Sequence, residues 1–135
     1  MFDTKIAIIV RDDLATWQKL NVTAFLMSGI AGDNPKIIGQ PYRDKDSKTH
    51  LPMSVQPVIV LAGASNVLTN IRKRAHDRGV PTVAYIEEMF ATGHDEANRA
   101  VFAEHGADEA NTVGIALRAD KKIVDKITKG AKMHG

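Results

Sequence analysis

Short apolar runs that alternate with stretches of helical periodicity constrain the fold of this chain more than any other feature. Lys5–Val10 is a continuous apolar run rich in isoleucine, which is typical of a strand buried on both faces. Three later segments share this pattern: Pro57–Leu61, Pro81–Ile86 and Thr112–Leu117. Between them, apolar residues recur every three or four positions, as they do on a helix. The pattern therefore predicts an α/β fold.

The first predicted helix, Trp17–Ala31, is apolar nearly all round, and we expect it to be the most buried. Gln18, Asn21 and Ser28 are its polar exceptions, and their spacing places them on one stripe that should face protein or a pocket. Further helices are expected to start at Ser65, Thr92 and Asp120.

Strands that alternate with helices predict a three-layer α/β/α sandwich with a mostly parallel mixed sheet. A hairpin between Ile37 and Met53, with its turn at Asp44–Ser47, interrupts the alternation, and Pro41 and Pro52 confine its strands to a sheet edge. No repeat, linker or low-complexity segment divides the 135 residues. We therefore expect a single domain over residues 1–135.

Composition excludes several kinds of site. The chain has no cysteine, which excludes disulfides, zinc-thiolate sites and cysteine nucleophiles. It starts directly in a strand-like run, and no apolar run approaches the roughly 20 residues of a membrane span. We therefore expect a cytoplasmic protein that does not enter a membrane, and no motif predicts a cofactor or a metal. A net charge of +2 is too small to indicate nucleic acid.

The charged end of the first predicted strand is one candidate site, since ligands of open α/β sheets bind at the carboxyl ends of strands. Arg11, Asp12 and Asp13 stand there, and Lys19 follows on the next helix. Asp13 is a candidate general base, and the others are candidate ligand-binding residues together with Asn21 on that helix. The alternative is that one aspartate caps the helix or forms a surface ion pair.

The densest group of polar residues lies between Thr92 and Arg99. His94 and Asn98 face one way, because they are four residues apart on a helix, and so do Asp95 and Arg99. His94 or Asp95 is the candidate base, and Asn98 and Arg99 are candidate ligand-binding residues.

In this prediction Thr92 caps the helix, and His94 points with Asn98 toward Asp12 and Asp13. The alternative is a capped helix with one Asp–Arg pair.

A stripe of lysines marks the last predicted helix: Lys122, Lys126 and Lys129. It has two interpretations, a contact for RNA phosphates or a solvated helix face partly neutralised by Asp125. Few aromatic residues accompany it, so there is no platform for base stacking, and the solvated face is favoured.

Both ends of the chain resemble the type II peptidyl-tRNA hydrolases. Ile8–Leu14 and the helix after it resemble their opening, and Thr112–Ala116 with Val124–His134 resembles their last strand and tail. The whole chain is more closely similar to an uncharacterised bacterial family classed with that fold. This second similarity rests on Trp17, Leu20-Asn21, Gln56–Val58, Glu88–Asp95 and Asn98–Ala100.

The resemblance implies the type II peptidyl-tRNA hydrolase-like fold, but several positions differ from the hydrolases. Their first helix starts with a glycine-lysine turn, whereas this chain has Lys19 without the glycine. Their glutamine and histidine on that helix are replaced by apolar residues around Ala24 and Met27, and their aspartate-alanine-glycine loop by Thr92–Arg99. We therefore expect weak or no cleavage of peptidyl-tRNA.

Two functional hypotheses follow. In the first, the protein hydrolyses a small ester or amide, with His94 or Asp95 as base and Arg99 holding an anion or a carbonyl oxygen. In the second, it binds a small polar ligand or a protein partner without catalysis, as a homodimer that kept the fold and lost the chemistry. The exposure of His94 and Asp95, and whether they line a concavity, discriminates between the two.

Overall fold

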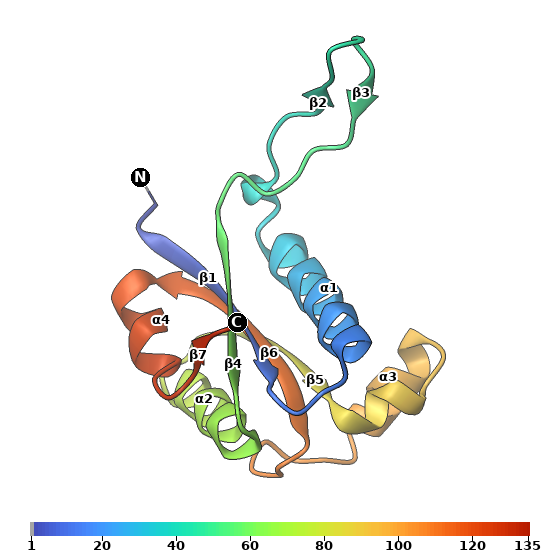
Figure 1. Ribbon diagram of the computed structural model, residues 1–135. Helices are drawn as coiled ribbons and strands as arrows, with labels where there is room; N and C mark the ends of the chain where they lie inside the picture. Colours follow the sequence, from blue (N-terminus) through green and yellow to red (C-terminus); the bar gives the residue numbers. More distant parts are fainter. Residues whose placement is uncertain (1) are drawn as a thin grey trace.

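A five-stranded sheet forms the centre of the computed structural model, which describes residues 2–135 (Figure 1). The strands lie in the order β5-β6-β1-β4-β7. Their bounds are Thr4–Arg11 for β1, Val58–Gly63 for β4, Thr82–Ile86 for β5, Thr112–Asp120 for β6 and Lys132–Met133 for β7. The helices are α1 (Thr16–Asp33), α2 (Ser65–Asp77), α3 (Asp95–Phe102) and α4 (Lys121–Ile127), with short 3-10 helices η1 (Pro35–Ile37) and η2 (Glu87–Ala91).

The sheet is mostly antiparallel, so the prediction of a mostly parallel sheet was wrong. Only β1 and β4 pair in parallel, whereas β6 runs antiparallel to both β1 and β5, and β7 antiparallel to β4. The reason lies between β5 and β6. Ile86 pairs with Thr112, so residues 87–111 leave and re-enter the sheet at the same end. Because α3 does not cross the sheet, β6 returns antiparallel.

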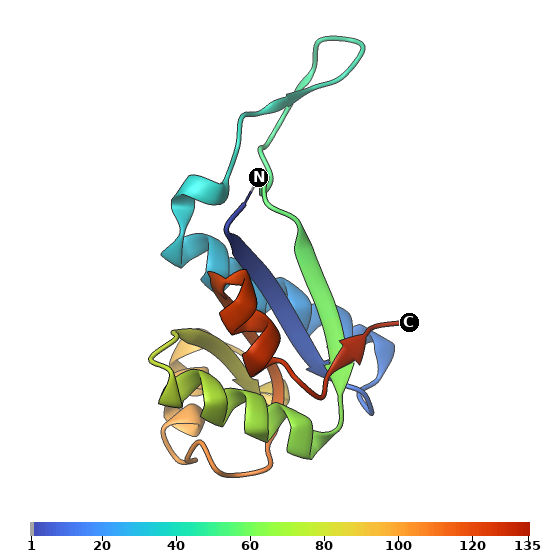
Figure 2. The ribbon, with the colours of Figure 1, turned by 90° about the vertical axis from the view of Figure 1, so that its left-hand side faces the viewer.

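Helices cover both faces of the sheet, as predicted (Figure 2). Successive residues of β1 point to opposite faces, so Ile6, Ile8 and Val10 pack in the cluster that includes α1. Ala7 and Ile9 pack instead with buried residues of α2 and α4. The continuous apolar run of β1 is therefore explained by burial on both sides. No helix among residues 2–135 is long and apolar enough to cross a membrane.

Much of the first helix is exposed, so the prediction that it is the most buried was wrong. Its buried residues are Val22, Leu26 and Ile30. Trp17 and Leu20 are 61% and 68% exposed. Trp17 still contacts Phe90, but most of the Leu20 side chain is left uncovered.

Residues 38–57 form an arm that projects from the body (Figures 1 and 2). The hairpin itself was predicted, and β2 (Tyr42–Arg43) pairs with β3 (Thr49–His50) across a turn that includes Ser47 with a positive φ of 64°. Its position was not predicted, because the arm forms a separate two-stranded sheet and does not join the edge of the main one.

Candidate ligand site between the first and third helices

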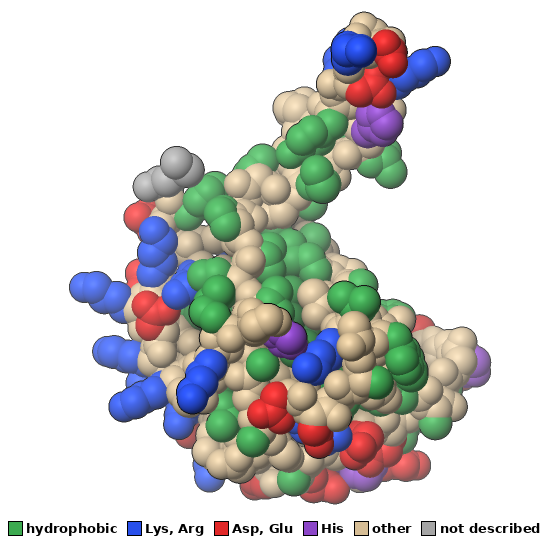
Figure 3. All heavy atoms as spheres, viewed as in Figure 1, with side chains coloured by type: hydrophobic (Ala, Val, Ile, Leu, Met, Phe, Trp, Pro, Cys, Tyr) green, Lys and Arg blue, Asp and Glu red, His purple; other side chains and the backbone are tan. Residues whose placement is uncertain are grey.

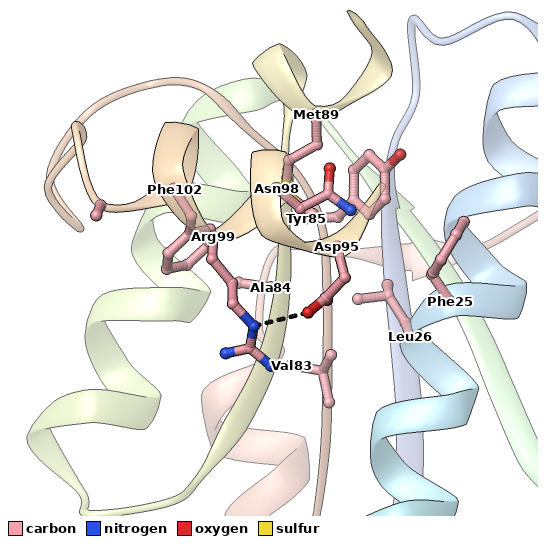
Figure 4. Close-up of a pocket in the computed structure, with 11 residues that line it drawn as sticks. Phe25, Leu26, Val83, Ala84, Tyr85, Met89, Asp95, Asn98, Arg99 and Phe102 are labelled. Carbon is pink, nitrogen blue, oxygen red and sulfur yellow. Dashed lines mark hydrogen bonds and ion pairs between the residues drawn. The ribbon is translucent and has the colours of Figure 1, made fainter. Parts of the chain in front are cut away.

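Two adjoining hollows lie between α1, β5, η2 and α3, and together we call them the α1–α3 cleft. Their volumes are about 490 and 340 Å³, which is within the range of small-molecule sites. Five residues line both hollows and make them continuous: Phe25, Tyr85, Met89, Asp95 and Asn98. Figure 4 shows the larger hollow, with apolar side chains from α1 and β5 facing polar ones from α3.

An aromatic chain forms one wall of the cleft. The ring of Tyr85 lies 5.2 Å from that of Phe90 and 5.8 Å from that of Phe25. Trp17 meets Phe90 edge-on at 5.8 Å. Such a wall offers flat apolar surface to a ligand with an aromatic or aliphatic body.

Tyr85 has a buried ring and a hydroxyl without a partner. The residue is only 5% exposed, but its hydroxyl oxygen, which has no hydrogen-bond partner within residues 2–135, is not a buried atom and reaches solvent in the cleft. A tyrosine with a buried ring and a solvent-accessible hydroxyl offers a ligand one apolar and one polar contact. Burial raises the pKa of Tyr85, so its hydroxyl keeps its proton near neutral pH and can donate a hydrogen bond to a ligand.

His94 caps α3, a role that the sequence assigned to Thr92. Its Nδ1 accepts a hydrogen bond from the backbone N–H of Ala97 at 3.2 Å. A nitrogen that accepts this bond carries no proton, so the neutral ring has its proton on Nε2. His94 is exposed and lines the cleft, where it offers an N–H donor. The prediction that Thr92 caps this helix was wrong.

Thr92 positions Asn98. The Thr92 hydroxyl donates to the carbonyl oxygen of Met89 at 2.8 Å and contacts Oδ1 of Asn98. The amide nitrogen of Asn98 has no partner within residues 2–135, and in Figure 4 it is directed toward Tyr85. Asn98 therefore adds a second donor to the cleft.

The predicted pair of Asp95 and Arg99 is confirmed. Nε of Arg99 lies 2.7 Å from Oδ2 of Asp95, as the dashed line in Figure 4 marks. Both side chains are more than three-quarters exposed, so the pair adds little stability. Both also line the larger hollow, where a ligand could displace either partner.

The second predicted group, at the carboxyl end of β1, forms a separate cluster. Arg11 is bonded to Asp13 at 2.6 Å and to Glu87 at 3.2 Å. Although burial acts to lower it, these two carboxylates raise the pKa of Arg11 above its ordinary value. Asp12 is exposed and, like Asp13, does not line the cleft. The structure therefore does not bring the aspartates into one hollow with His94.

The remaining predicted ligand-binding residues lie apart from one another. Lys19 donates from Nζ to Nε2 of His134 at 3.2 Å, which ties α1 to the C-terminal tail. Asn21 is exposed but lines the cleft beside Trp17. Of its two stripe partners, Gln18 accepts from the backbone N–H of Ala15, and Ser28 lies outside the cleft.

The comparisons with known proteins identify the family. The model of a family described as "Protein of unknown function (DUF2000)" matches residues 4–135. This chain belongs to that family. A solved structure of a protein of unknown function from Agrobacterium tumefaciens str. C58 is 61% identical in sequence, covers both chains in full and has a TM-score of 0.99. No curated protein matches the chain. The predicted membership of an uncharacterised family is thus confirmed.

Sequence reasoning found the polar side of the cleft in this DUF2000 protein but missed its aromatic wall. Tyr85 stands in an apolar run that indicates core, and Phe90 in a short turn. The sequence feature that could have revealed this wall is Tyr85, an aromatic residue with a hydroxyl near the carboxyl end of a predicted strand and a few residues before the polar segment Thr92–Arg99.

A polar cluster near the end of α3 was also missed. His105 contacts Glu109 at 2.9 Å and Glu88 at 3.5 Å, and Glu88 accepts a hydrogen bond from Asn111. Among residues 2–135, no group of histidine and acidic residues is arranged to hold a metal ion.

Proposed function

We propose that this protein binds a small molecule in the α1–α3 cleft, and that the ligand has a flat apolar body and an acceptor oxygen. The observation that carries the proposal is Tyr85, a buried ring whose hydroxyl has no hydrogen-bond partner within the described chain. Because the ring is buried while the hydroxyl stays accessible to solvent in the cleft, an acceptor oxygen of a ligand would take the place of water on it.

The donors around the cleft define the chemical class. The Tyr85 hydroxyl, the amide nitrogen of Asn98 and Nε2 of His94 all donate. A carbonyl or carboxylate oxygen would accept from them, while the aromatic chain would cover the ligand's apolar body. Arg99 at the rim would bind an anion only if the ligand displaces Asp95, with which it is paired.

Trp17 provides the readout for a test, because it lines the cleft and is the only tryptophan in the sequence. Benzoate and benzamide are probes that carry an acceptor oxygen, and toluene is the matched probe without one. We expect the first two, and not toluene, to change Trp17 fluorescence in a saturable way. If no probe changes either that signal or the NMR shifts of the cleft residues, the proposal is wrong.

A pair of tyrosine variants tests the hydroxyl itself. Tyr85→Phe removes one oxygen and keeps the ring, and we expect it to weaken binding of benzoate by roughly fivefold to tenfold, the equivalent of about 1 kcal/mol. Tyr42→Phe is the matched control, because Tyr42 lies on the arm and away from the cleft. Equal affinities of both variants would contradict the role of Tyr85.

Hydrolysis of a small ester or amide is the second candidate. It is supported by His94, Asp95 and Asn98 lining one hollow, and it is weakened by the use of Nδ1 of His94 as a helix cap. His94→Asn keeps an N-cap acceptor and removes the imidazole, whereas His94→Ala removes both. Turnover of p-nitrophenyl esters that both variants abolish would favour hydrolysis, and loss in His94→Ala alone would indicate a structural effect.

Several predictions from the sequence stay proposals. The type II peptidyl-tRNA hydrolase-like arrangement, the single domain and the cytoplasmic location rest on the sequence and the resemblance. Weak or absent cleavage of peptidyl-tRNA is still expected, and a turnover assay with Lys19→Ala and Asp95→Ala variants would test it. The last helix ends at Ile127, so the prediction that Lys129 continues its lysine stripe was wrong, while Lys122 and Lys126 are exposed on α4 and their RNA interpretation stays untested. Asp125, which was expected to neutralise that stripe, is paired with Lys5 at 2.6 Å.

A further inference from the structure

An apolar hollow of about 510 Å³ lies in the angle between the arm and α1, and we call it the crook. Ala24, Met27 and Ala31 line it from α1, and Ile38, Met53 and Val58 line it from the base of the arm and the start of β4. In Figure 3 hydrophobic side chains gather in this angle and along the arm. The crook is separate from the α1–α3 cleft, since the two share no lining residue.

The arm has a regular backbone but no core. The backbone N–H of Gly39 donates to the carbonyl oxygen of Met53 at 3.0 Å, and that of Val55 to Ile37 at 2.7 Å. Beyond Pro41 and Pro52 the strands pair again as β2 and β3. However, no residue from 38 to 55 is buried. An isolated two-stranded hairpin is marginally stable in water, so packing against another surface would stabilise this arm.

The arm has an apolar stem, which contains Leu51, Met53 and Val55, and a charged tip, which is residues 43–48. Leu51, Met53 and Val55 occupy every second position, and Leu51 is 87% exposed. This alternation is typical of a strand with one covered side. The charged residues are gathered at the tip, between Arg43 and Lys48. The stem would therefore fit an apolar surface while the tip stays in water.

We propose that two copies of this chain form a symmetric dimer in which the arm of each copy packs on α1 and into the crook of the other. One chain carries both an apolar projection and an apolar recess, which is the self-complementarity that a two-fold interface requires. Leu20, 68% exposed on the outer side of α1, would be covered by the stem of the partner's arm.

The apolar area available matches that of a stable dimer. Seven large apolar side chains on α1, the arm and the start of β4 are exposed: Leu20, Ile38, Tyr42, Leu51, Met53, Val55 and Val58. They leave roughly 400 Å² of apolar surface per copy, taking about 100 Å² for a fully exposed side chain. Two copies would bury about 800 Å², and a specific interface buries about 700–1,300 Å² of apolar surface in total.

Sedimentation equilibrium of the full chain tests the proposal directly. We expect a species of twice the 14.7 kDa chain mass that dissociates on dilution. Leu51→Asp in the arm and Leu20→Asp on α1 should each raise the dissociation constant at least about tenfold, because each buries a charge at the interface. Met133→Asp is the matched control, since Met133 is also exposed but lies on β7, and it should leave the constant unchanged.

Cross-linking tests the pairing of the two surfaces, since the chain has no cysteine of its own. Leu20→Cys and Leu51→Cys are made as separate proteins and mixed under oxidising conditions. We expect a disulfide between the two different variants in preference to pairs of the same variant.

Three results would overturn the proposal. The first is a chain that stays monomeric at every concentration, even if its arm and α1 bind a different protein. The second is a dimer that both aspartate variants leave intact. The third is random cross-linking. Circular dichroism of each variant separates loss of the dimer from loss of the fold.

Discussion

The first two helices pack on opposite faces of the same sheet and differ mainly on the sides that face away from it. α2 buries Leu68, Ile71 and Ala75, and its outer positions are polar: Asn66, Asn70, Lys73 and Asp77. α1 also buries three residues, but its outer positions include Trp17, Leu20 and Phe25. A three-residue inner stripe is therefore enough to hold a helix on this sheet. Trp17 and Phe25 contact Phe90 and Tyr85, but Leu20 is 68% exposed and is not needed for the packing of one chain, which points to an interaction beyond it.

The largest effect that tests this comparison concerns the inner leucines. Leu68→Ala on α2 and Leu26→Ala on α1 should each lower the free energy of unfolding by about 2–5 kcal/mol, because both side chains are fully buried. Leu20→Ala should change it by less than about 0.5 kcal/mol. Urea denaturation at low protein concentration, where association does not contribute, measures all three. A Leu20→Ala loss as large as that of Leu26→Ala would end the distinction between the two sides of α1.

The close contact between α1 and β6 gives the next effect. A Cβ added at Gly114 would collide with Val22 and Leu26 of α1. Gly114→Ala should therefore cost about 1–3 kcal/mol, because the helix must move away from the strand. Gly32→Ala is the matched control, because Gly32 lies on α1 and nothing is within 4 Å of a Cβ added there. It should be neutral or stabilising, and thermal denaturation of both variants would show whether α1 is held this closely.

A smaller effect is expected at the start of α4, which packs on the same face of the sheet as α2. Oδ1 of Asp120 accepts a hydrogen bond from the backbone N–H of Lys122 at 3.0 Å and caps α4. Asp120→Ala should cost about 1 kcal/mol, whereas Asp120→Asn keeps the cap and should cost less than half of that. Equal losses in urea denaturation would mean that the charge of Asp120, and not its cap, holds α4.

The smallest effect concerns α3, which differs from α1 and α2 because it has no buried residue. The segment after it is held by His105, whose hydrogen bond to Glu109, together with the nearby charge of Glu88, raises its pKa above 6.5. A histidine whose pKa is higher in the folded state than in the unfolded state stabilises the fold fully at a pH below the unfolded-state pKa. This stabilisation is lost as the pH rises through the folded-state pKa. Stability should therefore fall slightly above pH 6.5.

His105→Asn should remove this part of the pH dependence. His76→Asn is the control, because His76 is exposed on α2. Unfolding midpoints in urea, measured between about pH 6 and 8, would reveal the difference. If the unfolding midpoint changes with pH equally in wild type and in His105→Asn, the contact between His105 and Glu109 does not contribute to stability.

The strands were predictable, whereas their directions were not. The run expected at Lys5–Val10 lies inside β1, and the run expected at Thr112–Leu117 lies inside β6. Both are continuous apolar runs, and burial on both faces requires such runs in any sheet. The direction of β6 depends on whether the segment between β5 and β6 crosses the sheet, which no local pattern encodes.

The polar half of the site was predictable for a similar reason. His94, Asp95, Asn98 and Arg99 lie on one helical turn, and the period of the helix brings them together before any tertiary contact forms. The cap was misplaced because a hydroxyl at Thr92 satisfies the usual preference, and the chain enters α3 two residues later.

The sequence by itself determined the four longer strands and the helices of this protein, their N-caps within two residues and the polar turn of α3, because these depend on contacts between near neighbours in the chain; it did not show the end of α4 at Ile127 or the short strand β7. Only the tertiary structure decided that the sheet is antiparallel around β6 and that the hairpin projects as an arm. It also decided that Tyr85 has a buried ring and a hydroxyl without a partner, and that Leu20 on α1 is left uncovered. These features depend on which distant segments meet, and an apolar residue has the same pattern whether its own core or a second chain covers it.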